Sequence, residues 1–196
     1  QRQMCIRDRN SEAQTKMGNA LNLLMNGNVF LYYGEELGMK GSGKDENKRA
    51  PMYWSKDGNA EGMCKGPADM DDFRMKFDSL EEQQEDPDSI YNYVKQVIRV
   101  RNQNPVIARG TTAYLEQYSG EQCFAMTRSD ENSSLLMLGN TSAETATVDL
   151  SGLTIGKTAA EELVLLGELY TGEETAERAG TVVTLPAYSI LILGEE

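Results

Sequence analysis

Seven short apolar runs recur at regular intervals in the C-terminal half of this 196-residue chain. Gly, Asn, Ser and Asp separate the runs, and apolar and polar residues alternate within several of them. Alternation turns one side of a strand toward a core, and evenly spaced turn residues join such strands antiparallel. The chain after about residue 108 is therefore predicted to form an all-β antiparallel sandwich. The runs are TTAYLEQY, QCFAMTR, SLLMLGN, ATVDLSG, LVLLGELY, TVVTLP and YSILIL.

The residues before this half follow a different pattern. Ser11 and Gln14 predict a capping box at the start of a helix, and Gly27 is predicted to stop that helix. The next run, Val29–Tyr33, is apolar on both faces, which predicts a parallel strand covered on each side. Helix, tight loop and buried strand together are half of an α/β repeat unit. The apolar positions of the helix are Ala13, Met17, Ala20, Leu21 and Leu24.

Residues 39–85 are rich in Gly, Lys, Asp and Met and show little periodicity, which predicts a long functional loop. Asp86 and Pro87 then predict the start of a second helix, which Asn104-Pro105 ends. Its predicted buried stripe is Ile90, Val94, Val97 and Ile98. We expect a domain boundary near residue 107, which divides the chain into domains 11–107 and 108–196.

Composition excludes several classes of function. A net charge of −12 disfavours nucleic acid or an anionic membrane as partner. The chain has no histidine, so Ser-His-Asp and Cys-His catalysis and His-containing metal sites are excluded within it. Cys5, Cys64 and Cys123 are far apart and lack a CxxC spacing, which favours unpaired thiols over a zinc or redox site. No apolar run approaches the roughly 20 residues of a membrane span.

Residues 1–10 are set apart from the rest. The string QRQMCIRDR lacks apolar periodicity and resembles translated sequencing-adapter read-through. We interpret 1–10 as a non-native segment on a chain that is a fragment, and exclude it from the fold prediction.

Three motifs carry a resemblance to a known family: FLYYGEELGM, DENKRAPMYW and DPDSIYNYVKQVIRVRNQNP. Together they resemble the end of the catalytic barrel in glycoside hydrolase family 13, the α-amylase and α-glucosidase family. In that family the eighth barrel strand ends in a Tyr-Tyr-Gly-Glu-Glu type turn. A loop with Arg-x-Pro-Met-x-Trp follows, then a long helix and a β-sandwich domain. The resemblance covers residues 12–196 and implies the last helix–strand–loop–helix of a TIM-type (β/α)8 barrel, followed by the antiparallel sandwich.

The resemblance implies that the catalytic carboxylates are absent from this chain. The family cleaves glycosidic bonds with two carboxylates that flank the scissile bond, and a third binds the distorted sugar. All three lie on earlier barrel strands, the third in an Asn-His-Asp motif before the helix that begins near Ser11. Asp8 stands near that place, but its neighbours do not match, so no catalytic role is transferred to it.

Glu35 and Glu36 follow the predicted strand and suggest an acid–base pair. Sequence neighbours on extended backbone point to opposite sides, so they cannot easily flank one bond. We predict instead that both anchor the loop at the catalytic face, accepting hydrogen bonds from backbone N–H groups or from arginine.

Arg49 is the best candidate for direct substrate contact, because a guanidinium can bond two sugar hydroxyls. An ion pair with Glu35, Glu36, Asp45 or Glu46 is the equally weighted alternative. Trp54 is the only tryptophan and could stack on a pyranose ring, although packing of the loop onto the barrel is favoured. Tyr32 and Tyr33 are predicted to be core residues.

No cofactor or metal site is identified within the chain. Asp69, Asp71 and Asp72 could offer oxygen ligands to calcium, but they lack a glycine-punctuated spacing, so a solvated acidic turn is favoured. Calcium remains open for the longer protein.

The resemblance implies a retaining α-glucan hydrolase of the α-amylase type, with this chain inactive alone. Its expected partners are an α-glucan or maltooligosaccharide substrate and the missing N-terminal part of the barrel. Two alternatives stay open: an α-glucosidase, oligo-1,6-glucosidase, transglycosylase or trehalose synthase of the same family, and a non-catalytic carbohydrate-binding module. The last would leave strand 29–33 with unpaired edges. An extracellular or cell-envelope location is favoured over a cytoplasmic one.

Overall fold

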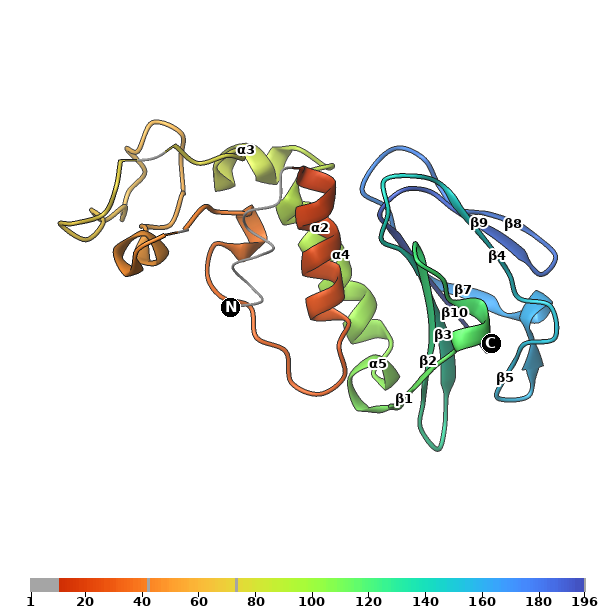
Figure 1. Ribbon diagram of the computed structural model, residues 1–196. Helices are drawn as coiled ribbons and strands as arrows, with labels where there is room; N and C mark the ends of the chain where they lie inside the picture. The colour runs from red at the N-terminus through yellow and green to blue at the C-terminus, as the bar shows by residue number, and fades with distance from the viewer. Residues whose placement is uncertain (1–10, 42, 73, 196) are drawn as a thin grey trace. The chain divides into compact units, whose positions relative to one another are not determined.

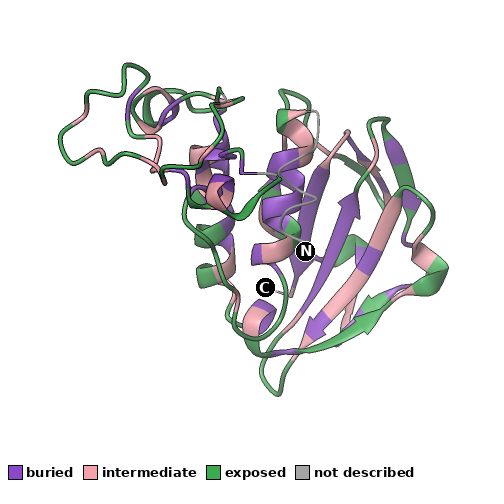
Figure 2. Cartoon of the chain, turned by 60° about the vertical axis from the view of Figure 1, so that its left-hand side comes forward, coloured by how far each residue is buried: buried purple, intermediate pink, exposed green. Residues whose placement is uncertain are grey.

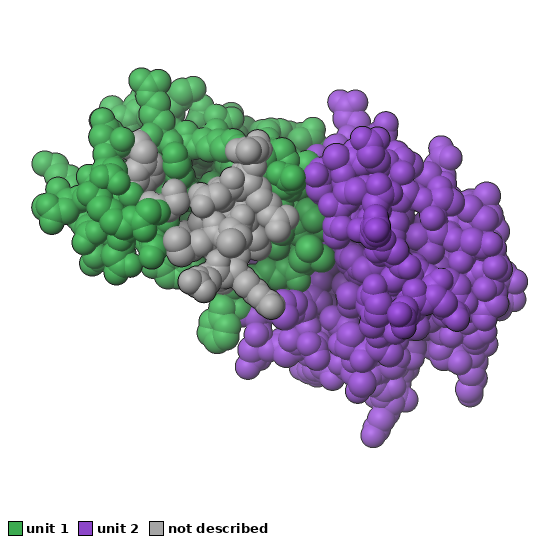
Figure 3. Space-filling model, in the orientation of Figure 1, with its two compact units in different colours: residues 1–22, 30–95 green, residues 23–29, 96–196 purple. Residues whose placement is uncertain are grey.

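A computed structural model of the protein describes residues 11–41, 43–72 and 74–195. These residues form two compact units, one of residues 11–22 and 30–95 and the other of residues 23–29 and 96–195 (Figure 3). The predictions for residues 1–10, including those for Cys5 and Asp8, lie outside the described residues. Cys64 and Cys123 are free cysteines. In the described ranges, no helix combines the length and the apolar character needed to cross a membrane.

The first helix, α2 (Glu12–Leu23), begins where the capping signal predicts. The hydroxyl oxygen of Ser11 accepts a hydrogen bond from the backbone N–H of Gln14 over 3.2 Å. Met17 and Ala20 are buried, as their spacing predicts. The helix ends at Leu23, four residues before Gly27, and Gly27 takes up a left-handed conformation in the loop that follows.

The segment Val29–Tyr33 is not a strand, so this prediction is wrong for the chain as described. Phe30 is 78% exposed, and Leu31, Tyr32 and Tyr33 are also exposed. A strand needs lateral neighbours for its N–H and C=O groups, and the described part of the first unit contains none. Four of the five residues of the apolar run are therefore exposed.

Residues 39–85 contain short helices where the sequence predicts only loop. These are η2 (Asp45–Arg49) and α3 (Leu80–Glu85), and a further short helix, η1 (Glu35–Leu37), directly precedes the segment. A capping box starts α3, in which Oε2 of Glu82 accepts the Ser79 hydroxyl at 2.8 Å and the Ser79 backbone N–H at 3.1 Å.

The long helix α4 (Ile90–Gln103) starts later than predicted. The hydroxyl of Ser89 accepts the backbone N–H of Asn92, which makes Ser89 the capping residue. Asp86 closes the preceding turn instead, accepting the backbone N–H of Asp88 at 2.9 Å. The helix ends before Asn104, as predicted.

Three of the four predicted stripe residues of α4 are buried, but Ile98 is 37% exposed. Tyr93 and Val100 are buried instead and extend the stripe along the same helix. The predicted position of Ile98 in this stripe is therefore wrong.

All seven predicted strands are present, and every pairing between strands is antiparallel (Figure 1). A five-stranded sheet has the order β1-β2-β3-β10-β7, a three-stranded sheet the order β4-β9-β8, and β5 pairs with β6. The sequence missed β5, β6 and β8, which are only two or three residues long. The strands are β1 (Thr111–Tyr114), β2 (Cys123–Ser129), β3 (Ser134–Asn140), β4 (Ala146–Asp149), β5 (Thr154–Ile155), β6 (Thr158–Ala159), β7 (Val164–Leu169), β8 (Glu177–Ala179), β9 (Val182–Leu185) and β10 (Ser189–Gly194). Short helices α5 (Val106–Arg109), η3 (Glu116–Tyr118) and η4 (Ala160–Glu162) complete the described elements of this unit.

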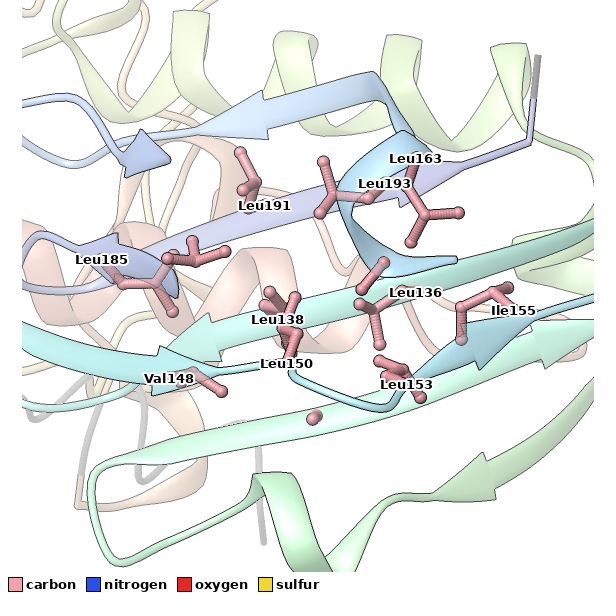
Figure 4. Close-up of a cluster of buried hydrophobic side chains, with 13 residues drawn as sticks. Leu136, Leu138, Val148, Leu150, Leu153, Ile155, Leu163, Leu185, Leu191 and Leu193 are labelled. Carbon is pink, nitrogen blue, oxygen red and sulfur yellow. The ribbon is translucent and has the colours of Figure 1, made fainter. Parts of the chain in front are cut away.

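The sheets enclose an apolar core (Figure 4). Leu136 and Leu138 of β3 and Leu191 of β10 face Val148 and Leu185 of the smaller sheet. Each fully buried leucine contributes about 1.5–3 kcal/mol relative to an exposed one.

The central strands β3 and β10 are buried on both faces (Figure 2). The second face of the sheet is covered by the C-terminal half of α4. Val100 lies so close to Gly167 that a Cβ there would stand 2.8 Å from its methyl carbon, and Gln96 donates to the carbonyl of Glu168 at 3.0 Å. These contacts place residues from Gln96 onward in the second unit. The predicted domain boundary near residue 107 stays a prediction.

Candidate functional site

Two glycines shape the turn that contains Glu35 and Glu36. Gly34 and Gly38 have φ angles of +85° and +63°, a left-handed conformation that favours glycine. A Cβ on Gly34 would lie 2.6 Å from Sδ of Met39, and one on Gly38 would lie 2.7 Å from the ring of Phe77. The backbone N–H of Met39 donates to the carbonyl of Gly34 at 2.9 Å and closes the turn. We call residues 34–39 the Gly-Glu-Glu turn.

Glu35 anchors this turn from within. Its side chain is 7% exposed, and Oε2 accepts the backbone N–H of Tyr32 at 3.2 Å. Its carbonyl oxygen accepts the side-chain amide of Asn19 on α2 at 3.1 Å. Because its carboxylate is engaged in holding the turn, Glu35 is suited to support a site.

Glu36 has an unsatisfied carboxylate oxygen. Its Oε2 is buried and accepts no hydrogen bond from any residue that the structure describes. Burial of such an atom without a donor is costly. Both glutamates lie on the 3-10 helix η1, which corrects the expectation of extended backbone. Their anchoring role in a complete site stays a prediction.

Tyr33 links the Gly-Glu-Glu turn to the loop that carries Arg49. Its hydroxyl donates to the carbonyl of Ala50 at 3.0 Å, and its ring lies 4.8 Å from that of Tyr32. Both tyrosines are more than 40% exposed, so their prediction as core residues is wrong for this chain. The contact brings the two sequence motifs side by side in the first unit.

Arg49 lies exposed at the end of η2. Its Nη2 lies 3.6 Å from Oε1 of Glu46, one of the four ion-pair partners considered from the sequence. Both side chains are solvent-accessible, so the pair is weak and leaves the guanidinium able to change partner.

Trp54 is 40% exposed and therefore is not a core residue in this chain. Its backbone N–H donates to the carbonyl of Met52 at 3.1 Å, and its carbonyl accepts from Glu81 at 3.2 Å. The backbone is thus held while the indole stays accessible. Substrate contact by Arg49 and Trp54 stays a prediction.

Asp71 has a structural role in the same loop. The side chain of Asn47, only 5% exposed, donates to Oδ2 of Asp71 at 2.8 Å and accepts its backbone N–H at 2.9 Å. Lys44 pairs with Oδ1 at 2.7 Å. The hydrogen bonds from Lys44 and Asn47 lower the pKa of the Asp71 carboxyl. Both carboxylate oxygens of Asp71 are thus engaged within the protein. Among the described residues, no three His, Cys, Asp or Glu side chains are grouped so that they could hold a metal ion.

Sequence reasoning missed the residues that hold the turn in place. Asn19 and Gln83 are buried polar residues on helices, and Gln83 donates to the carbonyl of Leu37 at 3.1 Å. A polar residue at a helix position that the periodicity assigns to the buried face is the one signal that could have found Asn19.

Comparisons with known proteins agree with these motifs. The family model "Alpha amylase, catalytic domain" matches residues 2–110. The solved structure of Eubacterium rectale Amy13B is 42% identical, with a TM-score of 0.88 over 95% of this chain and 35% of that one. Alpha-amylase 3 of Dictyoglomus thermophilum is 30% identical over 94 residues, which cover 48% of this chain and 19% of that protein. The trehalose synthase of Thermus thermophilus is 28% identical over 142 residues, 67% of this chain and 15% of that protein.

The chain thus spans less than a quarter of the length of these two curated relatives. The catalytic-domain model covers more than half of the chain, up to the start of β1. The likeness to Amy13B extends through the antiparallel sheets that follow. The chain therefore belongs to the α-amylase family.

Proposed function

We propose that the protein to which this chain belongs hydrolyses α-glucosidic bonds in starch-type glucans and maltooligosaccharides with retention of configuration. The observation that carries this proposal is the match of the α-amylase catalytic-domain model to residues 2–110. The contact between Tyr33 and Ala50 supports it, because it holds the Gly-Glu-Glu turn against the Arg49 loop.

The exposed segment Val29–Tyr33 acts in this proposal as the last strand of the catalytic barrel. Its apolar side chains are suited to burial between barrel and helices, and its backbone groups to pairing with parallel strands. The same assembly would bring a donor to the unsatisfied oxygen of Glu36. The missing strands thus account for both features.

The reaction requires two carboxylates about 5–5.5 Å apart, one as nucleophile and one as acid and base. Glu35 is committed to its turn, so the reacting pair is assigned to residues outside this chain. Arg49 is assigned to substrate hydroxyls or to a neighbouring catalytic carboxylate, and Trp54 to a sugar face. Calcium binding by the longer protein stays a prediction.

A trehalose synthase of the same family is the second candidate, favoured by the 28% identity to the Thermus thermophilus protein. Transfer to a sugar uses the same residues and differs in how well water is excluded. The loops that decide between water and sugar lie on the missing part of the barrel.

The test compares two proteins: the 196-residue chain alone, and the chain joined to the sequence encoded directly upstream. Each is incubated with maltoheptaose and with maltose, and reducing sugar and trehalose are quantified. We expect release of reducing sugar from maltoheptaose by the longer protein and none by the chain alone. Trehalose from maltose would favour the second candidate, and activity of the isolated chain would overturn the assignment of the carboxylates.

A further inference from the structure

Four of the ten methionines line a single pocket in the first unit. The pocket has a volume of about 490 Å³, and all four side chains are half-buried, so they face both the protein and solvent. They are Met52, Met63, Met70 and Met75. The other lining residues are Ala50, Pro51, Tyr53, Lys56 and Arg74.

Three of these methionines anchor the loop segments that carry them. Met52, Met70 and Met75 pack against a small buried cluster of Leu37, Met39 and Ala50. That cluster includes the end of the Gly-Glu-Glu turn. Thioether side chains therefore contribute half of the partly buried contacts to this cluster, beside Tyr53, Leu80 and Tyr91.

Two of the sulfur atoms have little room for an added atom. Sδ of Met70 packs on Gly66, where a Cβ would lie only 2.7 Å from it. Sδ of Met63 accepts the hydroxyl of Ser55 at 3.8 Å, and Ser55 is 7% exposed. An oxygen on either sulfur would have to displace a neighbour or reorganise this hydrogen bond.

We propose that this pocket is a site of methionine oxidation by hydrogen peroxide and that sulfoxide formation loosens the loop that carries Trp54. A thioether sulfur attacks one peroxide oxygen, the O–O bond breaks, and an S–O bond forms. The sulfur loses two electrons to give the sulfoxide, and the second peroxide oxygen leaves as water. The inference stands on packing alone and does not depend on the proposed function.

The sulfoxide makes the side chain polar. Its oxygen accepts hydrogen bonds, which the buried cluster of Leu37, Met39 and Ala50 cannot donate from its side chains, so the oxidised methionine is drawn away from that cluster and toward solvent. Met52 is two residues from Trp54 and accepts its backbone N–H, so displacement of Met52 reaches the indole directly. Trp54 is the only tryptophan and therefore reports this event without background.

Other methionines provide internal references in the same chain. Met25 is 52% exposed and lies outside the pocket. Met17 and Met137 are 1% and 2% exposed, in α2 and β3. Because susceptibility follows exposure, the four half-buried pocket residues should oxidise more slowly than Met25 and faster than Met17 and Met137.

The experiment treats the 196-residue chain with hydrogen peroxide and samples it over time. Peptide mass spectrometry gives the rate at each methionine, and Trp54 fluorescence is followed in parallel. We expect the Trp54 emission to shift to longer wavelength at the same rate as the pocket methionines are oxidised. A mixture of methionine sulfoxide reductases A and B should reverse this shift. The same mass spectra serve as a control, because they would detect any oxygen added to Trp54 itself.

Leucine variants separate the pocket from general oxidation. Met→Leu conserves volume and cannot be oxidised, so Met63→Leu with Met70→Leu should reduce the fluorescence change by at least half. The control Met25→Leu should leave it unchanged. The proposal would be overturned if a variant with all four pocket methionines replaced by leucine still showed the whole fluorescence change of Trp54. It would also be overturned if the four pocket methionines oxidised as slowly as Met17. Equal oxidation of all the compared methionines would also overturn it, since the pocket would then give no selectivity.

Discussion

The side-chain amide of Gln83 in α3 donates to the carbonyl oxygen of Leu37 over 3.1 Å, which ties α3 to the Gly-Glu-Glu turn. The same amide nitrogen donates to the carbonyl of Asp78 at 2.7 Å, and Oε1 accepts the backbone N–H of Tyr91 at 3.1 Å. One buried side chain thus connects the turn, the capping segment of α3 and the first turn of α4.

Replacing Gln83 by methionine should destabilise the first unit. The change keeps length but leaves two carbonyls and one N–H without their partner, which costs about 1–3 kcal/mol. Urea unfolding followed by Trp54 fluorescence measures it. Gln84→Met, at an exposed position of the same helix, is the matched control, and equal effects of the two variants would contradict the role of Gln83.

The capping carboxylate Glu82 should make the first unit sensitive to acid. Hydrogen bonds from the Ser79 hydroxyl and backbone, and then from Lys56, lower the pKa of Glu82 in the folded chain. A carboxyl with a lowered folded-state pKa stabilises the fold at neutral pH. That stability is lost as pH falls below the ordinary value of 4.5 and through the lower folded value.

In the Glu82→Gln variant, the urea concentration at half-unfolding, followed by Trp54 fluorescence, should therefore depend less on pH between about pH 6 and about pH 3. Glu81→Gln, at the exposed neighbouring position, should keep the dependence of the parent chain. An unchanged pH profile in Glu82→Gln would show that the capping box does not contribute.

Arg101→Lys should destabilise the second unit although it keeps the charge. The guanidinium donates to the carbonyls of Leu23, Met25 and Gly27 at 2.6–2.7 Å. A lysine ammonium lacks this planar fork, so a loss of about 1–2 kcal/mol is expected. Thermal unfolding by circular dichroism measures it, with Arg99→Lys at an exposed position of α4 as control. Equal melting temperatures of the two variants would argue against this role.

Arg49→Ala separates structure from substrate binding. Because the pair with Glu46 is exposed, the free energy of unfolding of the chain should change by less than about 0.5 kcal/mol. In the longer enzyme, kcat/KM on short maltooligosaccharides should fall by about 1–3 kcal/mol of transition-state binding. A stable variant with an unchanged kcat/KM would exclude substrate contact by Arg49.

The strands of the sandwich could be predicted because their signal is local. Leu135–Leu138 and Ile190–Leu193 are apolar without a break, as strands buried on both faces must be. Their pairing was not predictable, since β10 lies between β3 and β7, and no local pattern encodes that Ser189 pairs with the distant Asn140.

The start of α4 was predicted too early, at Asp86-Pro87. In the structure Ser89 caps the first turn of the helix, while Asp86 closes the turn before it. The buried face of α4 was predicted with one error at Ile98, because periodicity does not show how wide a surface the sheet covers.

The sequence by itself determined the two long helices α2 and α4, seven strands and the motifs of the α-amylase family, because capping residues, periodicity and glycine positions act over a few residues. Tertiary structure decided which groups meet: Tyr33 with Ala50, Asn47 with Asp71, and Gln83 with Leu37. It also left Phe30 and its neighbours exposed, although their composition favours burial. Burial is a property of two surfaces, and a run of apolar residues specifies only one of them.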